Sequence, residues 1–86
     1  MKKHFRYYRV SRHPALIVDS DEHCYAFHRV TSSKKSGHHK NWVVYPNPDV
    51  SRLSPMYIVR RRESDKKNRF GKKLSWDGEN AWKNKK

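Results

Sequence analysis

The first third of the chain consists of short stretches rich in β-forming residues, separated by polar turns. Residues 5–10 combine aromatic, arginine and valine side chains, and the run 15–18 is wholly apolar. A polar turn over 19–22 is followed by a second apolar and aromatic stretch at 25–31. Because β-branched and aromatic residues favour strands, we expect a strand in each stretch. The short turn predicts that 15–18 and 24–31 form a hairpin.

The rest of the chain shows a weaker pattern. Residues 41–45 predict a fourth strand, which the following prolines end, because proline lacks a backbone donor and disfavours helix in the residue before it. Residues 56–59 predict a fifth strand. A short helical turn within 63–74 is expected to lead into a strand through 74–76. Residues 77–86 are expected to form a frayed basic tail.

Short strands without a long amphipathic helix predict a mainly β fold. The chain has 86 residues, and a chain of this size buries only about 60–65% of its unfolded surface, which leaves room for one small domain. So few apolar side chains can share one core most readily if the sheet closes or coils. We therefore expect a single domain over residues 1–76, built as a small barrel or a strongly curved antiparallel sheet with one short helical turn.

Lysine and arginine outnumber the acids throughout the chain. There are 21 Lys and Arg against 8 Asp and Glu, for a net charge of +13. The excess occurs both before and after residue 60, so the charge belongs to the domain rather than to a tail. A surface this basic attracts polyanions. The composition favours a nucleic-acid partner over a small-molecule substrate.

Several classes of protein are disfavoured by what the sequence lacks. The longest apolar run, 15–18, is far shorter than the ~20 residues of a membrane helix, and the two lysines after Met1 are not followed by the apolar part of a secretory signal. A single cysteine, Cys24, allows neither an intramolecular disulfide nor a cysteine-based zinc site. No glycine-rich phosphate loop is present. We expect a cytoplasmic protein that uses no membrane, metal or cofactor.

Six histidines include the adjacent pair His38 and His39. Neighbouring residues on a strand point to opposite faces, so this pair is poorly placed to ligate one metal ion. Two interpretations remain: exposed loop residues, or groups that contact RNA or transfer protons, since imidazole titrates near neutral pH.

Two motifs follow each other along the chain. The first is RHPALIV at residues 12–18, and the second is VTSSKK at residues 30–35. Together they resemble the MazF/PemK family of toxin endoribonucleases, in which a basic residue before Pro-Ala precedes a core strand and a Thr-Ser turn ends a following strand. The similarity continues more loosely through residues 56–59 and 66–74, and it covers most of residues 5–76.

The resemblance implies an SH3-like barrel that is the toxin of a toxin–antitoxin system and cleaves single-stranded RNA without a metal. In that reaction the ribose 2′-hydroxyl attacks the adjacent phosphate and leaves a cyclic phosphate. The chemistry needs a proton acceptor, a proton donor and fixed positive charge, which His, Arg, Ser and Thr can supply. The matching positions imply that His13, Thr31, Arg12 and Ser32 are catalytic.

The match has one departure. The family usually has arginine directly before the proline, whereas this chain has His13 there and Arg12 one position earlier. Either His13 acts as the general acid or base, or the site is altered. Thr31 also has a structural alternative, as a strand-end hydroxyl that satisfies a turn.

Basic and polar residues outside the catalytic set form a second group of candidates. Guanidinium groups match phosphate oxygens and carboxylates alike, so this group is expected to contact RNA or an acidic antitoxin. The expected nucleic-acid contacts are Ser33, Lys34, Lys35, His38, His39, Lys40, Arg60, Arg61 and Arg62. The aromatic residues expected to stack on unpaired bases, where they are not needed in the core, are Tyr7, Trp42, Tyr45 and Tyr57.

Three functions are consistent with these patterns. The leading hypothesis is a metal-independent endoribonuclease toxin, with single-stranded RNA as substrate, an antitoxin that is an acidic protein or an RNA, and a homodimer among the expected assemblies. The second is a non-catalytic basic β-barrel that binds nucleic acid or a nucleoprotein, as a ribosome-associated or phage-encoded inhibitor would. The third is a module whose basic face binds an acidic protein.

Overall fold

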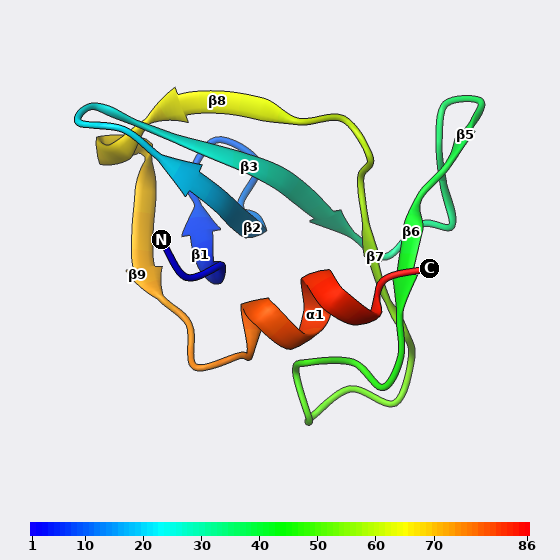
Figure 1. The fold of residues 1–86 in the computed structure, drawn as a ribbon. Helices are drawn as coiled ribbons and strands as arrows, with labels where there is room; N and C mark the ends of the chain where they lie inside the picture. Colours follow the sequence, from blue (N-terminus) through cyan, green and yellow to red (C-terminus); the bar gives the residue numbers. More distant parts are fainter.

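The hairpin expected near the N-terminus lies at the centre of a computed structural model that describes residues 1–86. β2 (His13–Ser20) pairs antiparallel with β3 (Cys24–Thr31), in a register that sets Ala15 opposite Arg29. β1 (His4–Tyr8) pairs with the other edge of β2 (Figure 1). The three strands expected in this part of the chain are therefore confirmed.

The remaining elements extend this sheet on both sides. β7 and β8 both pair with β3, β6 pairs with β7, and β9 pairs with β1, while β4 and β5 form a separate hairpin. In chain order these elements are β4 (Lys35–Ser36), β5 (His39–Lys40), β6 (Trp42–Val44), β7 (Met56–Ile58), β8 (Glu63–Lys66), the 3₁₀ helix η1 (Lys67–Arg69), β9 (Phe70–Lys73) and α1 (Gly78–Asn84).

The sheet rolls around one face of β2 but does not close. β8 runs along β3, and the short η1 leads it into β9, which runs along β1 (Figure 1). β8 and β9 are not paired with each other, so a closed barrel is not confirmed. What the structure shows is a mainly β fold, with 45% of residues in strands and 12% in helices, built on an antiparallel sheet.

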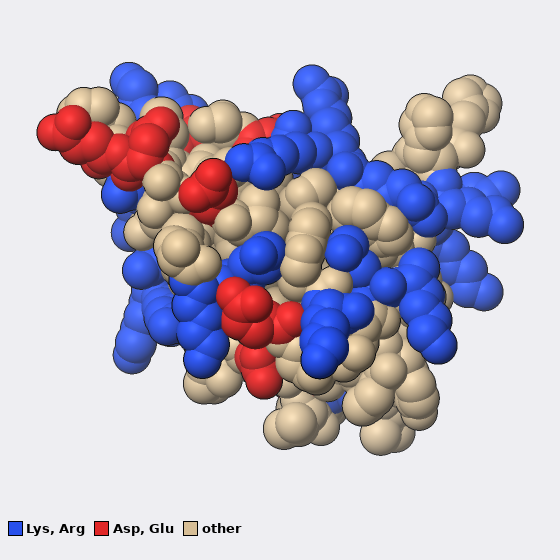
Figure 2. All heavy atoms as spheres, viewed as in Figure 1, with Lys and Arg blue, Asp and Glu red and all other residues tan.

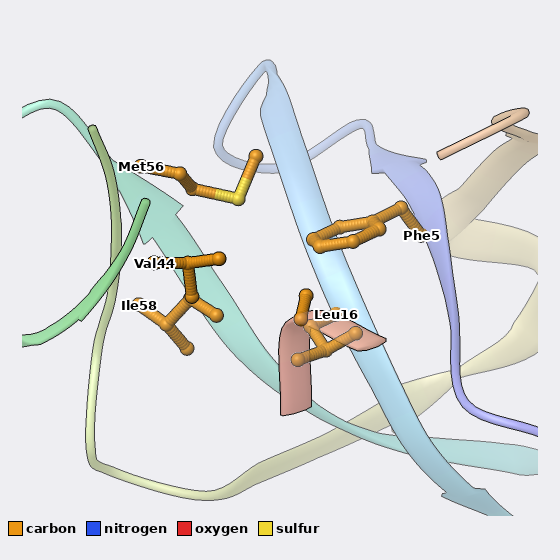
Figure 3. Close-up of a cluster of buried hydrophobic side chains, with 6 residues drawn as sticks. Phe5, Leu16, Val44, Met56 and Ile58 are labelled. Carbon is orange, nitrogen blue, oxygen red and sulfur yellow. The ribbon is translucent and has the colours of Figure 1, made fainter. Parts of the chain in front are cut away.

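The apolar run in β2 is buried on both faces. Ala15, Leu16 and Ile17 are all fully buried, and successive strand residues point to opposite faces. The helix-side core, on the face of Leu16, consists of Phe5, Leu16, Val44, Met56, Ile58 and Ala81 (Figure 3). The roll-side core, on the other face, consists of Tyr8, Ala15, Ile17, Phe27 and Phe70. Burial on both faces explains why this strand is an unbroken apolar run.

The expectation of a frayed tail over residues 77–86 is wrong. Asp77 caps α1, and its side chain accepts a hydrogen bond from the Asn80 N–H at 3.0 Å. Ala81 of this helix is fully buried in the helix-side core. After the helix, Lys86 exchanges two backbone hydrogen bonds of 3.0 Å with Val43 in β6. Tertiary contacts thus order a segment whose composition resembles a tail.

The short helical turn predicted within 63–74 is confirmed, but the strand after it is shifted. Within 63–74 only η1 is helical, and the strand after it is β9 rather than 74–76. Just after β9, the Leu74 N–H donates to the Phe5 carbonyl of β1 at 2.8 Å. The chain then turns away from β1, and the Trp76 ring packs edge-on against Phe5. No helix here has the length and apolar composition that crossing a membrane requires.

Substitution of Gly78 by alanine is expected to destabilise the fold. A Cβ at Gly78 would lie 2.6 Å from the Cα of His4 and 2.6 Å from the carbonyl oxygen of Lys3. Backbone cannot move aside as a flexible side chain can, so the free energy of unfolding should fall by about 1–3 kcal/mol in denaturant titrations. Gly71→Ala is the control, because its Cβ would meet Tyr7 at 3.4 Å. Equal losses in both variants would contradict the close approach of α1 to β1.

Candidate functional site

His13 and Thr31 lie side by side at one end of the β2–β3 hairpin. His13 begins β2 and Thr31 ends β3, and the register of Ala15 with Arg29, continued by two residues, sets them opposite each other. Both residues line a pocket of about 180 Å³, the hairpin-end pocket, and Ser32 lines it too. Three of the four expected catalytic residues therefore meet in one place.

The side chains of His13 and Thr31 are available for chemistry. The hydrogen bonds of His13 are made by its backbone, which contacts the Ser11 hydroxyl, so its exposed ring is left free. The Thr31 Oγ1 accepts from the Ser33 N–H at 3.2 Å and keeps its own hydrogen to donate. This bond is the turn-satisfying role considered for Thr31, and it leaves the hydroxyl oriented at the strand end.

The loop between β6 and β7 forms the opposite wall of the hairpin-end pocket. Asn47 is buried in this loop, where its Nδ2 donates to the Ser54 carbonyl at 3.0 Å and its Oδ1 accepts from the Asp49 N–H at 2.9 Å. Arg52 also lines the pocket, and its Nε lies 3.6 Å from Asp49 Oδ2. A hydrogen bond from the Ser51 hydroxyl is the main cause that lowers the pKa of Asp49, which favours its carboxylate form.

Arg12 does not line the hairpin-end pocket. It occupies the turn between β1 and β2 with a φ of 60°, and its side chain is exposed. Its N–H donates to the Tyr8 carbonyl at 2.9 Å, which holds this left-handed turn. The expected catalytic arginine is thus absent from the pocket, and the arginine that lines it is Arg52. Sequence reasoning missed Arg52 because it lies outside both motifs, 17 residues beyond the end of the second, in a loop without a recognisable pattern.

The β4–β5 hairpin presents most of the expected nucleic-acid contacts. Gly37 turns it with a φ of 63°, and Lys34, Lys35, His38, His39 and Lys40 are exposed around it. It projects from the sheet in Figure 1. No three His, Cys, Asp or Glu side chains in the structure come close enough to one another to hold a metal ion.

The three consecutive arginines after β7 separate into two environments. Arg60 donates from Nε to the Lys40 carbonyl at 2.8 Å, which ties it to the β4–β5 hairpin. Arg60, Arg61 and His39 line a second pocket of about 520 Å³, the arginine pocket. Arg62 instead lies 3.5 Å from an Asp19 carboxylate oxygen. Figure 2 shows acidic side chains gathered in a few places, among Lys and Arg side chains that spread over this face. Arg62 is therefore separated from the other two.

The aromatic candidates differ in how free their rings are. Tyr45 is 69% exposed and Tyr7 is 40% exposed, so both can stack on a ligand. Trp42 is half-buried, with the Arg60 guanidinium 5.4 Å and the Lys85 ammonium 4.9 Å from its ring centre. Because these two cations already contact the ring of Trp42, this ring is poorly placed to stack on a base. Tyr57 is half-buried in β7.

His28 is a buried titratable group that packs against the rings of Trp42 and Trp82, and its burial predicts a loss of stability in acid. Burial is the largest cause that lowers the pKa of His28, although its Nδ1 lies 2.8 Å from the Val59 carbonyl. Its folded pKa is therefore below the unfolded value, so the unfolded chain takes up a proton first as the pH falls below about 6.5. We expect the free energy of unfolding to decrease from pH 7 to pH 5, by at most about 1.4 kcal/mol per pH unit for this group.

The contribution of His28 can be separated from that of other groups by substitution. Burial also lowers the pKa of His4, so the wild-type dependence has two sources. Denaturant titrations at several pH values should show a shallower pH dependence in His28→Gln than in the wild type. A variant with an unchanged slope would contradict this role for His28.

Comparisons with known proteins supply no relative. A scan against protein-family models, a search of curated proteins and a search of solved structures each found no match to this chain. The residues and their geometry are therefore the basis for a functional proposal.

Proposed function

We propose that this protein is a metal-independent endoribonuclease that cleaves single-stranded RNA, with the hairpin-end pocket as its active site. The observation that carries the proposal is the meeting of His13, Thr31 and Ser32 with Arg52 in one small open pocket. A proton-transfer group, two hydroxyl donors and a guanidinium are the set that this reaction needs. The net charge of +13 favours a polyanionic substrate.

The reaction has a defined balance of bonds and protons. The ribose 2′-oxygen forms a bond to phosphorus and gives up its proton, and the bond from phosphorus to the 5′-oxygen of the next nucleotide breaks. His13 accepts the first proton, and the leaving oxygen takes up a proton from solvent. Thr31 and Ser32 donate to the phosphate oxygens, and Arg52 stabilises the negative charge that develops there. The products are a 2′,3′-cyclic phosphate and a 5′-hydroxyl.

The biological setting we propose is that of the toxin in a toxin–antitoxin pair, with an SH3-like barrel as the underlying fold. The ordered motifs at 12–18 and 30–35 support this setting, as does the roll of the sheet around the face of Ala15. The antitoxin is an acidic protein or an RNA, because either would neutralise the basic surface.

The deciding experiment is incubation of the purified protein with single-stranded RNA in EDTA. We expect cleavage, with products that carry cyclic phosphate ends and 5′-hydroxyls. RNA that stays intact at high protein concentration, yet binds with a steep salt dependence, would instead support a non-catalytic nucleic-acid-binding protein.

A further inference from the structure

Strand β3 contributes residues to both the hairpin-end pocket and the arginine pocket. Thr31 lines the hairpin-end pocket and Arg29 lines the arginine pocket. Side chains two residues apart on a strand point to the same face and lie about 7 Å apart. A strand of RNA that crosses the first pocket in this direction therefore reaches the second.

Two arginines of the arginine pocket are free to bind a ligand. Arg60 is held by the Lys40 carbonyl and by the ring of Trp42, so its position is preorganised while its terminal nitrogens remain unpaired. The side chain of Arg61 is exposed and makes no ion pair or hydrogen bond within the protein. Arg29 differs, because Glu63 accepts two hydrogen bonds from it, at 2.7 and 3.1 Å.

Asn41 lines the arginine pocket, and hydrogen bonds fix the orientation of its side-chain amide. Asn41 is 7% exposed, and its Nδ2 donates both to the Ser33 carbonyl at 3.0 Å and to the Ser36 hydroxyl at 2.9 Å. Its Oδ1 accepts from no protein group, and no buried side-chain oxygen in the structure lacks a partner, so this atom reaches the surface. An N–H group of a ligand can therefore donate a hydrogen bond to this oxygen.

The arginine pocket is large enough to hold a ligand bigger than a single phosphate group. Its volume of about 520 Å³ lies within the ~300–1,000 Å³ typical of small-molecule sites. Alongside its polar groups, Val59 contributes an apolar wall. Cationic groups, one acceptor and an apolar surface together match a nucleotide, which has an anionic phosphate, N–H groups on its base and a flat apolar face.

We propose that the arginine pocket binds a nucleotide that neighbours the scissile one on the same RNA strand. Arg60 and Arg61 contact its phosphate, and Asn41 Oδ1 accepts a hydrogen bond from its base. This inference rests on the proposed function, because it continues the path of the RNA from the hairpin-end pocket. It adds a binding site that contributes affinity and base preference without touching the reacting atoms.

The test measures binding of 2′-O-methyl RNA, which lacks the attacking hydroxyl and cannot be cleaved by this route. Labelled dinucleotides and tetranucleotides are titrated by fluorescence anisotropy against wild-type protein, Arg61→Gln and Lys72→Gln. Lys72 is an exposed residue of β9 outside both pockets, so its substitution controls for the loss of one charge. We expect Arg61→Gln to weaken tetranucleotide binding about tenfold more than Lys72→Gln does, and to reduce the slope of log affinity against log salt by about 0.7.

The outcomes separate this inference from the nuclease proposal. Equal weakening of tetranucleotide binding by Arg61→Gln and Lys72→Gln would overturn the nucleotide site, even if RNA is cleaved. Arg61-dependent binding of 2′-O-methyl RNA, with unmodified RNA left intact in EDTA, would support the nucleotide site and remove the nuclease. Both substituted side chains are exposed, so the folded state should be retained in each variant.

Discussion

Replacement of His13 by alanine is expected to lower the rate of RNA cleavage by about 100- to 10,000-fold, the range for loss of a general acid or base. His13 lines the hairpin-end pocket, and in the proposed reaction its free imidazole is the proton-transfer group. Removal of the Thr31 hydroxyl should cost about 10- to 100-fold, because the phosphate loses one hydrogen-bond donor while proton transfer remains. Single-turnover cleavage of a labelled RNA in EDTA measures both effects.

The control for these variants is His23→Ala. His23 lies in the turn at the opposite end of the β2–β3 hairpin, and its side chain is 81% exposed. Its loss should leave the cleavage rate and the stability unchanged. Cleavage that is equally fast in wild type, His13→Ala and Thr31→Ala would show that the activity comes from another site or from a contaminating nuclease.

Replacement of Trp82 by alanine is expected to lower the free energy of unfolding by about 3 kcal/mol, the lower end of the range for a buried tryptophan, because this ring is half-buried. The Trp82 ring packs edge-on against Trp42, with ring centres 5.6 Å apart, and at a tilt against His28, with ring centres 5.3 Å apart. The Lys85 ammonium lies 3.7 Å from its centre. Such a loss is a large part of the 5–15 kcal/mol that typically stabilises a protein, and denaturant titration measures it.

Lys83→Ala provides the comparison within the same helix. Lys83 is exposed on α1, and surface substitutions of this kind usually change stability by less than about 0.5 kcal/mol. The prediction for Trp82 is therefore a test of whether α1 is docked. If both variants unfolded like the wild type, residues 77–86 would behave as the frayed tail that their composition suggests.

The N-terminal half of the fold follows from local signals. β-forming residues at 13–20 and 24–31 are joined by a turn in which the Asp21 side chain accepts hydrogen bonds from the N–H groups of His23 and Cys24. Once that turn and the alternation of side chains are set, the ends of the hairpin meet. The predicted hairpin therefore brings its two ends together, but the pairing of His13 with Thr31 also needs a bulge between Ile17 and Asp19, which shifts the register by one residue.

The rest of the site depends on contacts between distant residues. Arg52 reaches the hairpin-end pocket because Asn47 and Ser54 hold the β6–β7 loop in shape, and no short-range pattern reports such a contact. Arg12 is excluded from the pocket by a left-handed turn, although it is adjacent in sequence to His13. Sequence spacing therefore grouped Arg12 with His13, whereas the structure places Arg52 in the pocket.

The sequence by itself determined the strands of the central hairpin and the basic character of the molecule, because propensity, charge and turn chemistry act over a few residues. Only the tertiary structure decided that the sheet stays open between β8 and β9, that Arg52 completes the pocket and that residues 78–84 are helical. A helix this short is unstable in isolation, since nucleation is costly. It forms here because burial of Ala81 and Trp82 against the sheet stabilises it.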